Sequence, residues 1–237
     1  MSIEDKVILI TGATGWLGRE VAPAIARTGA RLAITGRNQK TLQEVADSVN
    51  APDERLLVHP ANLADPAEVQ TLMDAITARW EGVDILLNLA GGWAGGKRVA
   101  ETSEDEWTNM LDRNLRTAFL INRAVLPYMV EKGWGRIVNM GSRAVENPGP
   151  RQVAYNVAKA GVVALTRSIA AEYRRNGVAA NAILPAVIDT PPNREGRPDA
   201  DYSQWVPPGD LTALLLFLCS EKAGSLNGAS IAVHGQL

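Results

Sequence analysis

The glycine-rich stretch Thr11–Gly18 limits the fold of this chain more than any other feature of the sequence. It follows the short apolar run Val7–Ile10, which is typical of a buried strand, and it precedes a helical segment. A strand, a glycine-rich turn and a helix in this order are typical of dinucleotide-binding units. In such a unit Gly12 permits the tight turn, Gly15 lets the backbone approach a pyrophosphate, and Gly18 lets the helix pack closely on the strand. The helix N-terminus, with its free N–H groups and partial positive charge, then favours phosphate binding. The alternative is a plain strand-to-helix turn that binds no ligand.

Strand-like apolar runs alternate with helical patterns along the rest of the chain, and no repeat, low-complexity tract or linker interrupts them. Further strands are expected at Arg31–Thr35, within a unit from about Arg55 to Arg79, and at Val83–Asn88, Arg136–Met140, Val178–Leu184 and Ala229–Val233. Helices are expected at Thr102–Glu131, Gln152–Asn176 and Leu211–Cys219. This alternation predicts an α/β fold: one Rossmann-type domain over residues 1–237, with a doubly wound parallel sheet of about seven strands. The site is expected at the carboxyl ends of the strands.

Composition and charge exclude several classes of function. With 237 residues, 46% of them hydrophobic, the chain can bury the core of a single domain. The formal net charge is −2 and no basic run stands out, which argues against nucleic acid or an anionic membrane as a partner. Cys219 is the only cysteine, so no internal disulfide forms, and one cysteine with two histidines indicates no metal site. Without a signal peptide or an apolar run of membrane-spanning length, we expect a cytoplasmic protein.

Tyr155 and Lys159 carry the clearest sign of chemistry. They lie four residues apart at the start of an apolar helix, so their side chains share one helix face. A free phenol titrates near ~10, and a nearby cation favours the phenolate and lowers that pKa. Ser142, thirteen residues before Tyr155, ends a strand-like run and is expected to present a hydroxyl to the same crevice. Tyr-x-x-x-Lys alone is most often a surface pair, but the combination with Ser142 and a glycine-rich turn predicts an active site.

These motifs, together with Asn88-Leu-Ala-Gly91, resemble the short-chain dehydrogenase/reductase family over nearly the whole chain. The resemblance implies that Tyr155 exchanges a proton with a carbonyl or alcohol oxygen while a hydride moves to or from a nicotinamide. It also implies that Ser142 holds that oxygen, and that Lys159 lowers the pKa of Tyr155 and binds the nicotinamide ribose. Asn114 then holds a water beside Lys159 through a local helix distortion. A core amide bonded to the backbone is the alternative for Asn114.

The resemblance also implies a set of cofactor-binding residues. Tyr155 and Lys159 belong to this set, and its other members are Gly12, Thr14, Gly15, Trp16, Leu17, Gly18, Arg37, Asn62, Leu63, Asn88, Ala90, Gly91, Pro185, Ile188 and Thr190. The sequence departs from the family pattern at four points. Its glycines are spaced Gly-x-x-Gly-x-x-Gly rather than Gly-x-x-x-Gly-x-Gly, with Trp16 at a usual glycine position. Asn62 stands where an aspartate is usual, and Ala186 stands where a glycine is usual.

The end of the second expected strand bears on the choice between the two nicotinamide cofactors. A carboxylate there would bind the ribose 2′-hydroxyl of NADH, whereas an arginine pairs with the 2′-phosphate of NADPH. The chain has Gly36 and Arg37 at this point, so we expect NADPH in preference to NADH. A solvated surface arginine is the alternative.

Residues from about 190 to 206 are expected to form a substrate lid. The lid and the loop Gly91–Gly96 resemble those of dihydropteridine reductases, which lack the serine and carry an acidic residue that favours NADH. Substrate contacts are expected from Trp93, Ala144, Asn193 and Trp205, although Trp93 is equally consistent with a hydrophobic anchor.

Three functions are therefore considered. The first is NADPH-dependent interconversion of a small-molecule carbonyl and alcohol, the second is a pterin reductase, and the third is a redox-silent dinucleotide sensor or scaffold. A homo-oligomer, either a tetramer or a dimer, is expected because the helix from Gln152 to Asn176 is apolar on more than one face.

Overall fold

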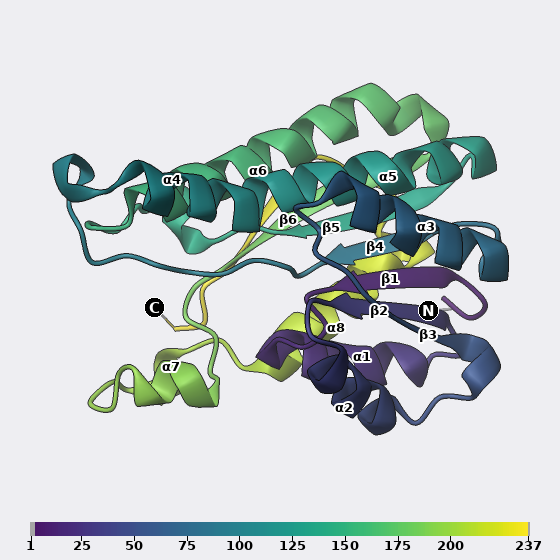
Figure 1. Cartoon of the computed structure of the whole chain (residues 1–237), viewed down its shortest axis with the longest axis horizontal. Helices are drawn as coiled ribbons and strands as arrows, with labels where there is room; N and C mark the ends of the chain where they lie inside the picture. The colour runs from purple at the N-terminus through teal and green to yellow at the C-terminus, as the bar shows by residue number, and fades with distance from the viewer. Residues whose placement is uncertain (1–2, 237) are drawn as a thin grey trace.

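A computed structural model describes residues 3–236. Seven parallel strands form one sheet in the order β3-β2-β1-β4-β5-β6-β7 (Figure 1). Their bounds are β1 (Val7–Thr11), β2 (Arg31–Gly36), β3 (Leu56–Pro60), β4 (Ile85–Asn88), β5 (Gly135–Met140), β6 (Val178–Pro185) and β7 (Ser230–Val233). The chain first builds outward from β1 to β3 and then, from β4 on, outward in the other direction. The doubly wound parallel sheet predicted from the alternating pattern is confirmed.

Helices cover both faces of the sheet (Figure 1). One layer holds α1 (Trp16–Ala26), α2 (Gln39–Val49) and α8 (Pro208–Cys219), and the other holds α3 (Pro66–Trp80), α4 (Glu104–Leu111), α5 (Thr117–Lys132) and α6 (Val153–Tyr173). The short helix α7 (Pro191–Glu195) projects away from both layers. Short helical turns are η1 (Asp53–Arg55), η2 (Val99–Glu101), η4 (Arg143–Val145), η5 (Arg174–Asn176), η6 (Tyr202–Gln204) and η7 (Glu221–Ala223).

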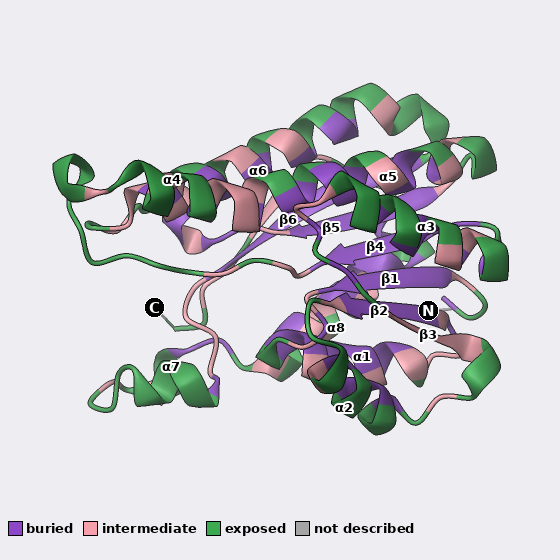
Figure 2. Cartoon of the chain, viewed as in Figure 1, coloured by how far each residue is buried: buried purple, intermediate pink, exposed green. Residues whose placement is uncertain are grey.

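The two layers explain why the central strands are apolar throughout. In β1, Ile8 and Ile10 enter the core beneath α1 and α8, whereas Val7 and Leu9 enter the core beneath α3 and α5. The central strands are correspondingly buried along their length (Figure 2). A strand covered on both faces needs a continuous hydrophobic run, which is the pattern seen at Val7–Ile10. Among residues 3–236, no helix has the length and apolar character needed to cross a membrane.

The single helix expected over Thr102–Glu131 is wrong in one respect. The structure divides it into α4 and α5, which are joined by one wide π-helical turn, η3 (Asp112–Arg116). Asn114 lies in this turn, and its side-chain amide donates to the carbonyl of Met110 at 3.0 Å. Such a bond competes with regular helical geometry, and wide turns of this kind are frequent at functional sites. Other boundaries differ by a few residues: β4 begins at Ile85, and the carboxylate of the preceding Asp84 accepts the N–H of Val7 at 2.7 Å.

A row of buried polar side chains crosses the middle of the sheet. Thr11, Asn88 and Asn139 are direct register partners on β1, β4 and β5. The Thr11 hydroxyl donates to Asn88 Oδ1 at 2.7 Å, and Asn88 Nδ2 donates to Asn139 Oδ1 at 2.9 Å. Asn139 in turn bonds Asn122 of α5 and, at 3.1 Å, Thr166 of α6. We call these five residues the amide row.

Candidate active site

A large cavity opens at the carboxyl ends of β1, β4, β5 and β6. Its volume is about 850 Å³, and it continues into a second cavity of about 270 Å³. Gly12, Gly15, Leu89 and Gly91 line both cavities, so the two form one extended crevice. In open parallel sheets, ligands bind at this edge, next to the point where the direction of strand addition reverses. Here that point lies between β1 and β4.

The glycine-rich turn is closely packed against the strand next to it. Gly12 has a φ of +65°, and a Cβ there would lie 2.8 Å from the backbone of Ala90. A Cβ on Gly18 would lie 2.6 Å from Cα of Ala13, so α1 approaches its own turn too closely for any side chain. Gly15 faces the crevice and meets only the carbonyl of Gly12 at 3.2 Å. Gly12 thus has the left-handed backbone expected of a tight turn, and Gly18 lets α1 pack closely, on the turn rather than on the strand. The open face at Gly15 is compatible with a pyrophosphate, whose binding there stays a prediction.

Trp16 occupies the first residue of α1 and lines the larger cavity with 50% of its surface exposed. Leu17 and Gly18 line the same cavity. Trp16 stands at a usual glycine position, but its indole is part of the cavity wall. The backbone of the glycine turn therefore remains open to the crevice.

The smaller cavity is lined by members of the expected cofactor-binding set. Thr14, Arg37, Asn62, Leu63, Ala90 and Gly91 all line it, together with Asp112 and Arg113. Arg37 is exposed and forms no ion pair within the described residues. A Cβ on Gly36 would lie 3.0 Å from the side chain of Thr14, so a larger residue here would be crowded. The side-chain oxygen of Asn62 already accepts the N–H of Ala64 at 3.3 Å.

Ser142, Tyr155 and Lys159 meet in the larger cavity. Ser142 follows β5, while Tyr155 and Lys159 come from the first two turns of α6. The Ser142 hydroxyl accepts the N–H of Ala144 at 3.1 Å, which leaves its own proton free to donate. The ammonium of Lys159 donates to the carbonyl of Met140 at 2.8 Å and lies 5.9 Å from the centre of the Tyr155 ring.

Burial controls the protonation of this set. It raises the pKa of Tyr155 above its ordinary value of 10.0, and the Ser142 hydroxyl opposes this effect. Burial also lowers the pKa of Lys159 from 10.5 to about 8. The pKa of Tyr155 is therefore raised, where Lys159 was expected to lower it: the ammonium donates to the Met140 carbonyl, and desolvation of the phenol is the largest effect on its pKa.

Three residues expected at the site lie beside the crevice rather than in its wall. Asn88 is a member of the buried amide row. Trp205 is 4% exposed and packs on Tyr202, with ring centres 4.8 Å apart, so its ring is buried within the segment 190–206 and does not line the cavity. Asn114 is 1% exposed and holds Gly92 through two bonds: its Oδ1 accepts the Gly92 N–H at 3.1 Å, and its Nδ2 donates to the Gly92 carbonyl at 3.0 Å.

The loop after β6 forms the opposite wall. Pro185, Ile188 and Thr190 line the larger cavity as expected, and so does Asn193, whose Nδ2 donates to the carbonyl of Ile188 at 2.8 Å. Ala144 and Trp93 line it from the other side, and Trp93 Nε1 donates to Gln152 Oε1 at 2.9 Å.

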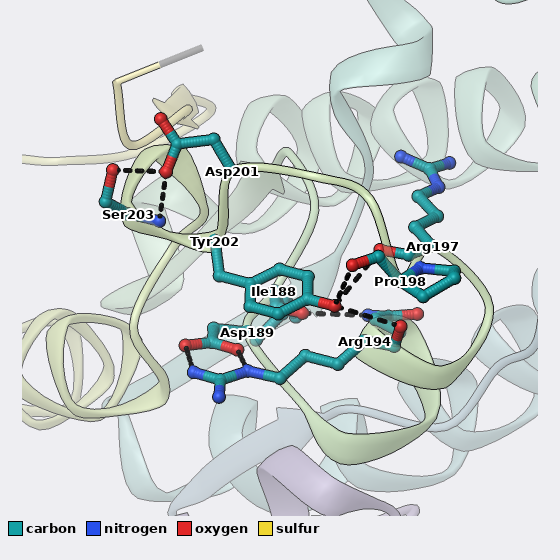
Figure 3. Close-up of polar contacts among 9 residues, drawn as sticks. Ile188, Asp189, Arg194, Arg197, Pro198, Asp201, Tyr202 and Ser203 are labelled. Carbon is teal, nitrogen blue, oxygen red and sulfur yellow. Dashed lines mark hydrogen bonds and ion pairs between the residues drawn. The ribbon is translucent and has the colours of Figure 1, made fainter.

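The segment expected as the lid is internally bonded (Figure 3). Arg194 binds the Asp189 carboxylate through two bonds of 2.6 and 2.7 Å. The Tyr202 hydroxyl lies within hydrogen-bond distance, 3.1–3.3 Å, of the carbonyls of Arg194, Arg197 and Pro198. At the base of the segment, Ile188 pairs with Val206 in a parallel bridge.

Several lining residues were not predicted from the sequence. Arg143, Asn147, Gly149, Gln152, Pro192 and Arg197 line the larger cavity, and Arg113 lines the smaller one. Arg143 could have been found, because it directly follows Ser142. Arg197 carries no local pattern that distinguishes it from a solvated lid residue. Nowhere in residues 3–236 do three His, Cys, Asp or Glu side chains gather closely enough to hold a metal ion.

Comparisons with known proteins agree with this geometry. The family model of short chain dehydrogenases matches residues 6–201. The 3-oxoacyl-acyl-carrier-protein reductase FabG of Salmonella typhimurium is 30% identical over 243 residues, covering 99% of this chain and 98% of that protein. Among solved structures, levodione reductase matches with a TM-score of 0.91 at 31% identity, covering 98% of this chain and 97% of that one. An actinorhodin polyketide ketoreductase solved with NADPH matches with a TM-score of 0.90 at 26% identity, covering 99% and 98% of the two chains.

Proposed function

Because this chain belongs to the short-chain dehydrogenase/reductase family, and is therefore an NAD(P)-dependent oxidoreductase acting on alcohol and carbonyl groups, we propose that it reduces a small-molecule carbonyl with NADPH and with Tyr155 as general acid. One observation carries the proposal: Ser142, Tyr155 and Lys159 line the same cavity as the turn Gly12–Gly18. This shared cavity supports a proton donor acting next to a bound dinucleotide. The NADPH present in the related polyketide ketoreductase structure supports the choice of cofactor.

In this proposal the bound nicotinamide supplies a hydride, and the side chains of the chain manage the proton. Tyr155, whose pKa burial raises, carries its proton at neutral pH and donates it to the carbonyl oxygen. The free O–H of Ser142 gives that oxygen a second hydrogen bond and stabilises the developing negative charge. Proton donation by a positioned acid is typically worth ~10²–10⁴-fold in rate.

In this proposal Lys159 holds the cofactor ribose, and Asn114 holds the backbone beside Lys159. Lys159 has donors left over after its bond to Met140, and these would hold the nicotinamide ribose. A Cβ on Gly91 would lie 2.7 Å from Asn114 Oδ1 and 3.2 Å from Lys159 Nζ, so Gly91 packs between the two side chains. Asn114 thus fixes the Gly91–Gly92 backbone beside Lys159. In this proposal a water beside its π-helical turn would return a proton to Tyr155.

A panel of substrates tests the reaction. NADPH oxidation is measured with aldehydes, ketones and a quinonoid dihydropterin. Oxidation with ketones supports the proposal. Trp93, 62% exposed in the cavity wall, offers a flat surface for a pterin ring, and oxidation with the pterin alone would favour a pterin reductase instead. Cofactor binding without oxidation by any substrate would indicate a dinucleotide sensor.

Arg37→Ala is expected to reduce the preference for NADPH over NADH by roughly 10–150-fold, because one charge-assisted contact to the 2′-phosphate is worth ~1.5–3 kcal/mol. The measurement is the ratio of the two dissociation constants by isothermal titration. Arg27→Ala, which removes an exposed arginine that does not line either cavity, is the control and should keep the ratio. An unchanged ratio in Arg37→Ala would remove the basis for assigning NADPH.

We also propose a homo-oligomer, a dimer or a tetramer, with residues 190–206 as the lid of each subunit. Of the apolar residues on α6, Val162, Val163 and Ile169 are buried within the chain, so they do not argue for a partner. Val157 of α6 remains 42% exposed and Phe119 of α5 remains 44% exposed. Sedimentation should show a dimer or larger species that Phe119→Glu dissociates and Val99→Glu, on an exposed turn elsewhere, does not. A wild-type monomer at micromolar concentration would contradict the proposal.

A further inference from the structure

The larger cavity carries positive charge without a matching negative charge. Arg143, on the turn that follows Ser142, and Arg197, in the lid, both line it in addition to Lys159. Among the described residues, no aspartate or glutamate lines this cavity. Arg143 is half-buried, so its guanidinium is partly removed from water. A partly desolvated cation in a cavity wall indicates that an anion binds there.

Two acidic residues near this cavity, Asp189 and Glu146, have partners of their own. The Asp189 carboxylate is held by Arg194 through two bonds of 2.6 and 2.7 Å. Glu146 approaches His234 at 3.4 Å. Within residues 3–236, neither Arg143 nor Arg197 forms an ion pair. Figure 3 shows the Arg197 guanidinium pointing away from the Asp189–Arg194 pair.

Arg143 lies on the substrate side of the crevice rather than at the glycine turn. It follows β5, and β4 separates β5 from β1, which carries the turn Gly12–Gly18. The turn has its own means of binding phosphate, namely the N-terminus of α1. Arg143 is instead the chain neighbour of Ser142, the residue proposed to hold the reacting oxygen.

We propose, resting on the reductase function above, that the substrate is an oxo acid whose carboxylate pairs with Arg143, and that Arg197 closes on the same carboxylate from the lid. A guanidinium presents two parallel N–H donors that match a carboxylate. The carboxylate is a handle and does not react: the carbonyl carbon accepts the hydride, the carbonyl oxygen accepts the Tyr155 proton, and the product is the corresponding hydroxy acid. Arg143 thus selects the substrate and fixes which end of it faces Tyr155.

The test measures binding without turnover. Protein saturated with NADP+ is titrated with pyruvate, acetoacetate and levulinate, and with the methyl ester of each, which removes the charge and keeps the carbonyl. The ratio of the dissociation constant of the ester to that of the acid measures the preference for the anion. At least one acid should bind wild type roughly 10-fold or more tightly than its ester, and Arg143→Gln should abolish most of that ratio. Arg197→Gln should lower it less, because Arg197 is exposed.

The control Arg175→Gln removes one positive charge from η5, the exposed turn after α6, and should leave the ester-to-acid ratio unchanged. Equal binding of acids and esters by wild type, or an unchanged ratio in Arg143→Gln, would overturn the inference. A weaker dissociation constant for NADP+ in Arg143→Gln with the acid preference intact would assign the arginine to the cofactor and would overturn it as well. Because no step requires reduction, an acid preference in a protein that oxidises NADPH with no carbonyl would support the anion site and refute the proposed reductase.

Discussion

Tyr155→Phe is expected to lower turnover by ~10²–10⁴-fold while the dissociation constant for NADPH changes little. In the proposed mechanism the phenol acts on the substrate oxygen in the transition state, whereas most cofactor contacts would come from the cavity-lining glycine turn, Arg37 and the loop after β6. Single-turnover reduction measures the first quantity and isothermal titration measures the second. Tyr173→Phe, at the far end of the same helix, is the matched control and should keep full activity.

The pH dependence of Tyr155 provides an independent check. Because burial raises its pKa, the phenol holds its proton across the neutral range, and the rate of reduction should not fall until the pH passes that raised pKa. Above it the acid is lost and the rate declines. The residual activity of Tyr155→Phe should lack this decline. Wild-type activity in Tyr155→Phe would mean that another group supplies the proton.

Lys159→Met is expected to abolish most turnover and, at the same time, to stabilise the ligand-free protein at pH 7. Lowering the pKa of Lys159 from 10.5 to about 8 corresponds to about 3 kcal/mol of destabilisation at neutral pH. Methionine removes that cost and loses one charge-assisted hydrogen bond to the Met140 carbonyl, worth ~1.5–3 kcal/mol. The net gain of up to about 2 kcal/mol should raise Tm by up to roughly 4–8 °C for a domain of this size.

The size of the stabilisation by Lys159→Met depends on pH. Below pH 8 folded and unfolded states both carry the Lys159 proton, so the folded state bears the full cost of a buried charge. Between 8 and 10.5 only the unfolded state keeps the proton, so wild-type stability rises with pH until the cost is gone. The advantage of Lys159→Met should therefore shrink from pH 8 upward. Lys40→Met, at an exposed position, should change stability by no more than ~0.5 kcal/mol at either pH. A lower Tm for Lys159→Met than for wild type at pH 7 would refute the buried-charge account.

Features that depend on a local sequence pattern could be predicted, whereas features that depend on contacts between distant parts of the chain could not. The glycine turn and the alternation of strands and helices are local, and they predicted the sheet and the two layers of helices correctly. The helix distortion at Asn114 was expected only from the family resemblance and could not be predicted from periodicity, because the Asn114 side chain bonds both the local carbonyl of Met110 and the backbone of Gly92, twenty-two residues away in the sequence. Trp205 was assigned to substrate from its position in the lid, but its burial against Tyr202 is a tertiary fact.

The protonation of the site could not be predicted for a related reason. Spacing places Tyr155 and Lys159 on one helix face, but it does not reveal that Met140 binds the ammonium or that the phenol is desolvated. Arg143 illustrates the opposite case. Its position after Ser142 was visible in the sequence. The proposal that it binds an anion, however, depends on the absence of an acidic partner in the described part of the cavity, which only the structure shows.

The amide row has a consequence for how this protein can evolve. Thr11, Asn88 and Asn139 stand level on three adjacent strands, and the chain leaves each of them for the crevice within three residues, at Gly12, Gly91 and Ser142. Each bond in the row uses a donor from one member and an acceptor from the next, so an apolar replacement of one residue leaves its neighbour with an unmet polar atom in the core, at ~1–3 kcal/mol. Single replacements should therefore be selected against, while changes that replace donor and acceptor together are tolerated. These positions are therefore expected to vary as a group. Because they lie just before the glycine turn, the Gly91 loop and Ser142, the relative positions of these three site segments should be conserved together with the row.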